Sequence, residues 1–213
     1  AGMAAGIYFS NVDWHYVDGA WNMCRQDVAC REYIPDMKHS YPDRWGNFVN
    51  YQKEQIRELI SDYGKVDMMW FDLMWPNEWI WDAQATFEMI RKTAPEIIIN
   101  NRGTEVLSQQ MLSQKGYSDI KRLELLGDEM SYADFVTPEQ HIPGVPPKGY
   151  WESNITISNG LKGWSGFWYK GPDAVYKSAN EVLTVLMDVC SRGGNLLLNV
   201  GIKPDGTLVK EEE

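Results

Sequence analysis

The sequence contains no cluster of lysine and arginine and no long apolar run. Its 213 residues include 30 acidic and 20 basic side chains, which gives a formal net charge of −10 at pH 7. A surface of this sign repels a phosphate backbone, so we expect no nucleic-acid partner. No apolar stretch reaches the roughly 18 residues that a membrane-spanning helix needs, and we expect no membrane partner either.

Cysteine is scarce as well, with three in the chain. Cys24 and Cys30 lie in a polar, loop-like stretch and could form a disulfide, whereas Cys190 lies in an apolar helical run and is predicted to belong to the core. An odd number without a C-x-x-C pair predicts neither a disulfide framework nor a zinc site. No G-x-G-x-x-G motif follows a predicted strand, so the commonest dinucleotide fingerprint is missing too. We therefore expect no metal and no organic cofactor.

Aromatic residues, in contrast, are abundant, with ten tryptophans and eleven tyrosines. Their flat apolar faces and polar edges suit stacking against a sugar ring. Large rings also fill protein cores, and composition alone leaves both roles open.

Short β-prone runs alternate with segments of helical periodicity. Six runs are predicted as strands, the fourth on a weaker pattern: residues 6–10, 66–72, 96–102, 134–140, 154–158 and 195–201. Helices are predicted over residues 48–63 and 82–93, with a helical turn at 107–114 and a last helix that begins at Ser178 and ends before Gly193.

The predicted helices carry recognisable start and stop signals. The first has one apolar stripe and ends at Gly64; the stripe consists of Phe48, Gln52, Ile56, Leu59 and Tyr63. Asp82 can cap the second helix, which has Ala83, Phe87 and Ile90 at helical spacing. Ser178 and Glu181 form an S-x-x-E capping box at the start of the last helix.

Strands and helices in alternation predict an α/β fold with a parallel sheet covered by helices. A doubly wound open sheet and a (β/α)8 barrel of the TIM type both fit this order. Polar and aromatic residues gather after the first three strands, among them Asp13, Asp72 and Arg102. Active sites of barrels are built at that face, so the barrel is favoured. A complete barrel takes about 250 residues, and we expect residues 1–213 to form one partial barrel domain.

Asp72 is the carboxylate whose surroundings stand out. It ends the strand VDMMWFD and is followed by Leu-Met-Trp-Pro, and an acid among so much apolar surface must be paired, hydrogen-bonded or functional. Glycoside hydrolysis needs two carboxyl groups. Glu139 and Glu152 are the best candidate partners, although each, taken alone, fits a solvated loop carboxylate better.

The run VDMMWFDLMWP at 66–76 resembles the nucleophile strand of the α-L-fucosidases, family 29 of the glycoside hydrolases. GIYFSNVDWHY at 6–16 is similar to the family's preceding strand, and INNRG at 99–103 resembles the strand whose arginine reaches the substrate pocket. GYWES at 149–153 and KSANEVLTVLMDVCSRGGNLLLNVGIKPDGTL at 177–208 match the segment that closes the family's barrel. The resemblance covers nearly the whole chain, with residues 104–133 aligning loosely.

The resemblance implies a retaining glycosidase that releases α-L-fucose from fucosylated oligosaccharides or glycoconjugates. Asp72 matches the nucleophile, and Glu139 is preferred as the acid/base, with Glu152 in reserve. Arg102 and His141 are expected at the substrate, and three tryptophans are expected to wall the pocket: Trp14, Trp75 and Trp151. By resemblance the location is secreted, periplasmic or lysosomal.

The sequence also departs from the family pattern. The family's His-Trp pair and His-His-Asp run, which bind the fucose hydroxyls, are not found, and we expect them to precede Ala1 in a longer protein. The alternative is a truncated carbohydrate-binding barrel remnant with little or no turnover. An incomplete parallel sheet exposes strand edges, so we expect the isolated chain either to self-associate or to need the missing segment.

Overall fold

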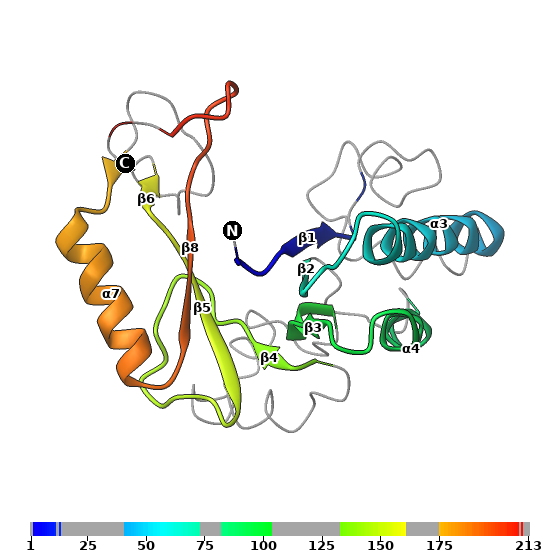
Figure 1. The fold of residues 1–213 in the computed structure, drawn as a ribbon, viewed down its shortest axis with the longest axis horizontal. Coiled ribbons are helices and arrows are strands. Elements are labelled where there is room, and N and C mark those ends of the chain that lie inside the picture. Colours follow the sequence, from blue (N-terminus) through cyan, green and yellow to red (C-terminus); the bar gives the residue numbers. More distant parts are fainter. Residues whose placement is uncertain are drawn as a thin grey trace. The chain divides into compact units, whose positions relative to one another are not determined.

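The computed structural model describes residues 2–11, 13, 41–72, 82–103, 133–160, 175–208 and 210. The chain forms two compact units, Ala1–Phe135 and Val136–Glu213, and each is described by itself (Figure 1). Both units combine helices with parallel strands, as the predicted α/β class requires. The predicted helical turn at 107–114 lies outside the described residues.

The first unit is built on three parallel strands in the order β1-β2-β3 (Figure 1). β1 (Gly6–Ser10) has the predicted bounds, and β2 (Met68–Asp72) begins two residues later than predicted. The two strands pair in register along their whole length, so that Ser10 lies opposite Asp72. Their carboxyl ends therefore meet at the same edge of the sheet, as predicted.

β3 (Ile98–Ile99) is parallel to β2 but much shorter than the strand predicted at 96–102. The side-chain amide of Asn100 forms hydrogen bonds with the backbone of Phe71. The chain then turns into η1, a 3-10 helix over Asn101–Gly103. The predicted parallel direction of β3 is confirmed. Its predicted length is wrong, because at Asn100 the side chain and not the backbone bonds to β2.

α3 (Pro42–Ser61) starts earlier and ends earlier than the helix predicted at 48–63. Proline in its first turn costs no hydrogen bond, because the N–H groups there have no partner within the helix. After the helix ends, Gly64 adopts a left-handed backbone with φ of 92°, a conformation that glycine tolerates without strain.

The buried face of α3 includes Phe48, Gln52 and Ile56, as predicted, but it begins earlier, at Trp45. It continues to Ile60 and not to Tyr63, because Tyr63 lies beyond the end of the helix and is exposed.

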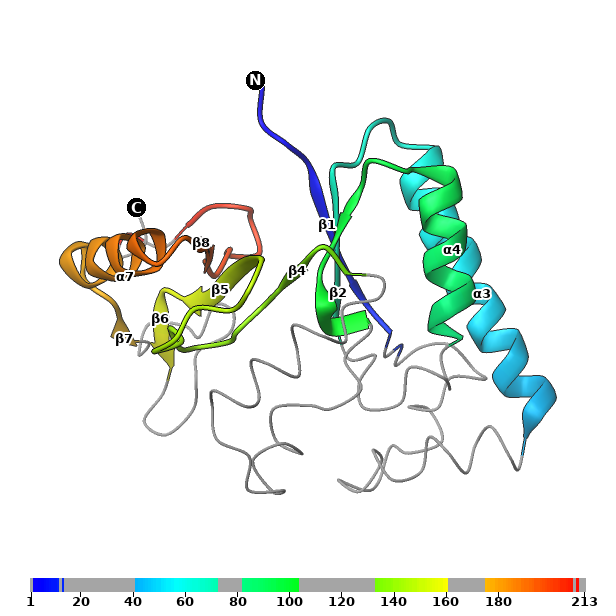
Figure 2. The ribbon, with the colours of Figure 1, turned by 90° about the horizontal axis from the view of Figure 1, so that it is seen from below.

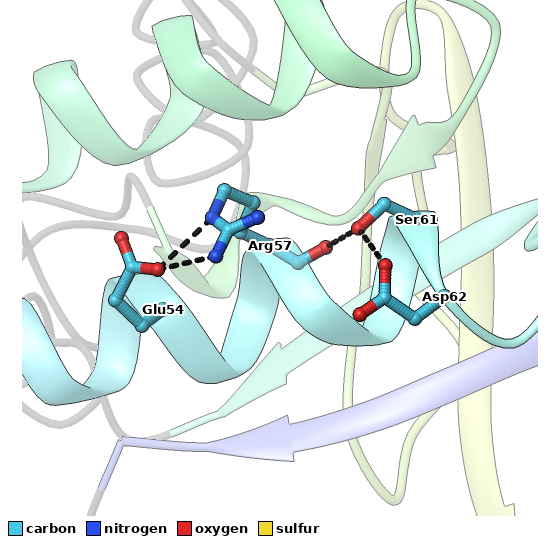
Figure 3. A network of polar contacts seen from close by, with 4 residues as sticks. All are labelled: Glu54, Arg57, Ser61 and Asp62. Carbon is cyan, nitrogen blue, oxygen red and sulfur yellow. Dashed lines mark hydrogen bonds and ion pairs between the residues drawn. The ribbon is translucent and has the colours of Figure 1, made fainter.

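The solvent-facing side of α3 carries a chain of polar contacts (Figure 3). Arg57 donates two hydrogen bonds to Glu54 Oε2, over 3.0 and 2.6 Å. The Ser61 hydroxyl contacts the Arg57 carbonyl oxygen over 2.7 Å and the Asp62 carboxylate over 2.8 Å. Exposed pairs of this kind are screened by water and contribute little to stability, so this network orders the helix surface without deciding the fold.

α4 (Ala83–Thr93) follows the predicted periodicity, but Asp82 does not cap it. Asp82 occupies the position before the helix with a left-handed backbone, φ 53°, and its side chain makes no capping hydrogen bond. Its carboxylate instead pairs with Lys53 of α3. The predicted cap is therefore wrong, since the side chain serves an ion pair between the two helices.

Both helices cover the same face of the sheet (Figures 1 and 2). Phe71 of β2 meets Phe87 of α4 edge to face, with ring centroids 5.4 Å apart, and Met69 is fully buried in the same core. Side chains alternate along a strand. Trp70 and Asp72 therefore belong to the opposite face, which the helices leave uncovered.

The second unit pairs β5 (Tyr150–Thr156) with β8 (Asn195–Asn199) in parallel. The strands predicted at 154–158 and 195–201 are thus confirmed with shifted bounds. α7 (Ala179–Ser191) lies between them in the chain, as a crossover between parallel strands requires.

Three short strands complete the described elements. The strand predicted at 134–140 is much shorter in the structure. It consists of β4 (Phe135–Val136) and a single β-bridge at Glu139. β6 (Ser158–Gly160) and β7 (Val175–Tyr176) form an antiparallel pair that the sequence pattern did not indicate.

The capping box of α7 is confirmed. The Ser178 side chain accepts from the Glu181 N–H, and the Glu181 carboxylate accepts from the Ser178 N–H. Cys190, predicted to belong to the core, is exposed. Val189 is the fully buried residue of this turn, and the next position lies about 100° further around the helix. No helix in the described part of the chain is long and apolar enough to cross a membrane.

Candidate active site

The carboxyl end of β2 carries the candidate nucleophile. Asp72 is the last residue of the strand and its side chain is 19% exposed. Trp70 lies two residues earlier on the same face, and the register places Tyr8 of β1 beside it. Two strands thus contribute polar and aromatic side chains to the sheet face opposite α3 and α4.

Both carboxylate oxygens of Asp72 accept hydrogen bonds. Arg102 Nη1 donates to Oδ1 over 3.2 Å, and the Tyr8 hydroxyl donates to Oδ2 over 2.7 Å. Bonds to an ionised group are stronger than neutral ones. Two donors on different oxygens also fix the plane of the carboxylate. The carboxyl group of Asp72 is therefore held in one orientation.

Arg102 is a buried cation, with its side chain only 7% exposed. Its guanidinium carbon lies 4.6 Å from the centre of the Trp70 ring, and that ring stacks on Tyr8 with centroids 5.6 Å apart. A cation removed from water needs a partner charge and a polarisable surface. Asp72 and Trp70 supply both, and they hold the guanidinium in place.

The sequence motifs indicated Asp72 and Arg102 but not Tyr8 and Trp70. Tyr8 and Trp70 each lie within a predicted strand, two residues before the polar residue that ends it. The alternation of side chains would have placed Trp70 on the face of Asp72. The role of Tyr8 needed the register between β1 and β2, which no local pattern carries.

A buried amide pair supports the end of β1 next to Asp72. The backbone N–H of Asn11 donates to the Asp72 carbonyl oxygen over 3.1 Å. Gln52 of α3 donates from Nε2 to the Asn11 carbonyl oxygen over 2.6 Å. The polar residue that follows the first predicted strand is therefore held by a partner on α3.

In the second unit, Glu139 lies beside β5 and forms an isolated parallel bridge with Asn154. The backbone around it is well anchored, because the Asn154 N–H donates to the Pro138 carbonyl oxygen over 2.9 Å. Bridged residues share a face of a sheet, and so do residues two apart on a strand. Glu139 and Glu152, the two acid/base candidates, therefore lie on the same face as Asn154.

The residue after Glu139 has an unusual backbone. Gln140 adopts φ of 56°, a conformation that is strained for a residue with a side chain. Its N–H donates to the Asn154 carbonyl oxygen over 2.8 Å, and its Oε1 accepts from Thr156 Oγ1 over 3.3 Å. His141 follows on the surface, with Nδ1 3.2 Å from the Glu139 carbonyl oxygen. This anchored turn sets the backbone position of Glu139.

Trp151 is 1% exposed and packs against Gly194, the residue just before β8. A Cβ atom at position 194 would collide with the tryptophan ring, so glycine is required there. Trp151 also precedes Glu152 and hence belongs to the opposite face of β5. The structure gives it a packing role, and its contact with a sugar stays a prediction.

The remaining predicted pocket residues, Trp14 and Trp75, lie outside the described residues. Within the described ranges, no group of three or more His, Cys, Asp or Glu side chains could hold a metal ion.

The whole chain, residues 1–213, matches the family model described as alpha-L-fucosidase. The chain belongs to the α-L-fucosidase family. This confirms the resemblance inferred from the sequence motifs, and the match includes the stretch at 104–133.

The chain matches only part of the length of known fucosidases. An α-L-fucosidase of Branchiostoma floridae is 35% identical over 75 residues, which is 35% of this chain and 16% of that protein. The solved α-L-fucosidase isoenzyme 1 from Paenibacillus thiaminolyticus is 25% identical, with a TM-score of 0.70 over 99% of this chain and 46% of that one.

The α-L-fucosidase AlfC from Lactobacillus casei, solved with α-L-fucose, has a TM-score of 0.65 at 22% identity over 98% of this chain and 57% of that one. At this identity the likeness shows the fold alone. The chain spans about half the length of these solved fucosidases.

Proposed function

We propose that this protein is an α-L-fucosidase that works by double displacement through a covalent fucosyl-enzyme. The observation that carries the proposal is the Asp72 carboxylate, held by Tyr8 and Arg102 at the carboxyl end of a parallel strand. A retaining glycosidase needs such a carboxylate, ionised and fixed in direction, as its nucleophile.

In the first step, an oxygen of Asp72 forms a bond to C1 of the fucosyl group while the bond from C1 to the departing oxygen breaks. Glu139 gives its carboxyl proton to that oxygen. In the second step, Glu139 takes a proton from water, whose oxygen bonds to C1 as the bond to Asp72 breaks. Fucose leaves and both carboxyl groups regain their starting states.

Tyr8 and Arg102 orient the carboxylate of Asp72 toward its reaction. Their hydrogen bonds weaken when the carboxylate becomes an ester, and they strengthen again as the ester breaks. Arg102 also has donors for sugar hydroxyls. Four further residues stay proposed substrate contacts by resemblance: Trp14, Trp75, Trp151 and His141.

The same family relation supports a single partial (β/α)8 barrel over residues 1–213. The strand order β1-β2-β3 with helices over one face, and the β5-α7-β8 crossover, are the arrangements that such a barrel repeats. We expect a fucosylated oligosaccharide or glycoconjugate as substrate and no nucleic-acid or membrane partner. We also expect the isolated chain either to self-associate through strand edges or to need a further segment of the barrel.

The test is release of 4-nitrophenol from 4-nitrophenyl α-L-fucoside by the wild-type chain and by Asp72→Asn. An amide is not a nucleophile here, so we expect turnover to fall by at least about 1,000-fold. Asp67→Asn is the matched control, because Asp67 lies just before the same strand and pairs with Lys65. It should keep wild-type turnover.

Wild-type turnover that survives Asp72→Asn would remove Asp72 from the mechanism. Binding of fucose by the wild-type chain without any hydrolysis would instead support a carbohydrate-binding remnant.

A further inference from the structure

The proposed mechanism does not use the side chain of Asn100, yet this side chain contacts the segment that carries the nucleophile. Asn100 directly follows β3 and is 0% exposed. Its Oδ1 accepts from the Phe71 N–H over 2.8 Å, and its Nδ2 donates to the Phe71 carbonyl oxygen over 2.9 Å. A primary amide presents an acceptor and a donor together. The Asn100 side chain therefore bonds to Phe71, the residue before Asp72, in the way that the backbone of a neighbouring strand would.

The backbone of Asn100 pairs elsewhere, through a parallel bridge with Phe135. The chain then enters η1, from which Arg102 reaches Asp72 Oδ1 and the face of Trp70. Asn100 thus joins the strand that carries the carboxylate to the turn that carries the guanidinium.

We propose that Asn100 is a positioning residue, which sets the separation and direction of Asp72 relative to Arg102. The inference rests on the proposed function, because it concerns the geometry of the same nucleophile. A displacement of about 1 Å at a reacting group can cost about 100-fold in rate. Loss of the paired hydrogen bonds should therefore reduce the chemical step more than substrate binding.

Two substitutions of similar side-chain size separate the contributions of donor and acceptor. In Asn100→Asp the carboxylate still accepts from the Phe71 N–H but cannot donate to the Phe71 carbonyl oxygen. In Asn100→Leu neither bond forms. We expect kcat on 4-nitrophenyl α-L-fucoside, per folded molecule of the full chain, to fall by about 100-fold in both variants. KM should stay within about threefold of the wild-type value, because uniform substrate binding is retained.

The matched controls are Ile90→Val and Ile90→Ala. Ile90 is as fully buried as Asn100, but it belongs to α4 and to the hydrophobic core of the first unit. These two variants lower the melting temperature without touching the backbone of β2, and kcat per folded molecule should be unchanged. If kcat falls equally in Ile90 variants of the same melting temperature, Asn100 has only a structural role and the proposal is wrong.

A crystal structure of Asn100→Asp gives a readout that does not depend on activity. We expect the distance between Arg102 Nη1 and Asp72 Oδ1 to exceed hydrogen-bond range, compared with 3.2 Å in the wild type. An unchanged distance would overturn the proposal. A wild-type chain without turnover would contradict the proposed function, and the distance would still decide the role of Asn100. Where Asn100→Leu does not fold, Asn100→Asp decides alone.

Discussion

Arg102 and Asp72 form an ion pair that is largely shielded from water, with side chains 7% and 19% exposed and a distance of 3.2 Å between Nη1 and Oδ1. Removing one partner of a buried pair leaves an uncompensated charge, which is strongly unfavourable. A small anion would relieve that cost. This relationship makes the site testable by chemical rescue.

Asp72→Gly should abolish hydrolysis of fucosides and regain part of it when azide is added. The substitution opens a space beside the Arg102 cation, and azide can enter from the face that the carboxylate vacated. The product should be the β-fucosyl azide, which NMR identifies by its anomeric coupling. An α-fucosyl azide, or no rescue in a folded variant, would contradict the assignment of Asp72 as nucleophile.

Tyr8→Phe should lower kcat by roughly tenfold. A hydrogen bond to a charged group contributes about 1.5–3 kcal/mol. Part of this contribution is absent at the transition state even in the wild type, so the expected loss is at the lower end. The ring and its stacking on Trp70 are kept. The matched control is Tyr63→Phe, whose hydroxyl donates to Glu58 over the same 2.7 Å at the remote end of α3. Steady-state kinetics of both variants make the comparison, and an equal loss in the two would exclude a role for Tyr8 at Asp72.

Glu139→Ala should harm natural fucosides more than activated aryl fucosides. A good leaving group departs with little protonation, so the lost acid matters less. Azide should then give the α-product, since the nucleophile is intact. The experiment compares kcat/KM for both substrate types in Glu139→Ala and Glu152→Ala. A loss confined to Glu152→Ala would move the acid/base role to Glu152, which lies on the same face.

The start of α7 should lose stability in acid. Hydrogen bonds from the Ser178 backbone and side chain lower the pKa of Glu181 in the folded chain. The folded state therefore binds this proton less readily than the unfolded state. The resulting stabilisation is complete above the unfolded pKa, about 4.3, and disappears as the pH falls through the lower folded value.

Glu181→Gln keeps an acceptor for Ser178 but does not titrate, so its unfolding free energy should fall less between pH 7 and pH 3.5. Urea unfolding at the two pH values measures this. Ser178→Ala removes the cap itself and should cost about 1 kcal/mol at neutral pH. An equal acid loss in wild type and Glu181→Gln would show that the capping box does not contribute to it.

The sequence by itself determined the elements whose signals are local. The bounds of β1, the position of Asp72 at the end of β2 and the capping box at Ser178 all come from contiguous residues. Alternation, helical period and capping chemistry depend on neighbours within a few positions. The family also followed from such runs of residues.

The tertiary structure alone decided which distant groups meet. The register of β1 and β2 brings Tyr8 to Asp72, and Asn100 shortens β3 by bonding Phe71 with its side chain. Asp82, which by sequence is a helix cap, pairs with a lysine of another helix. In each case a polar side chain bonds to a partner that is distant in the sequence. The choice of partner depends on the distances that packing imposes, and those distances exist only once the chain has folded.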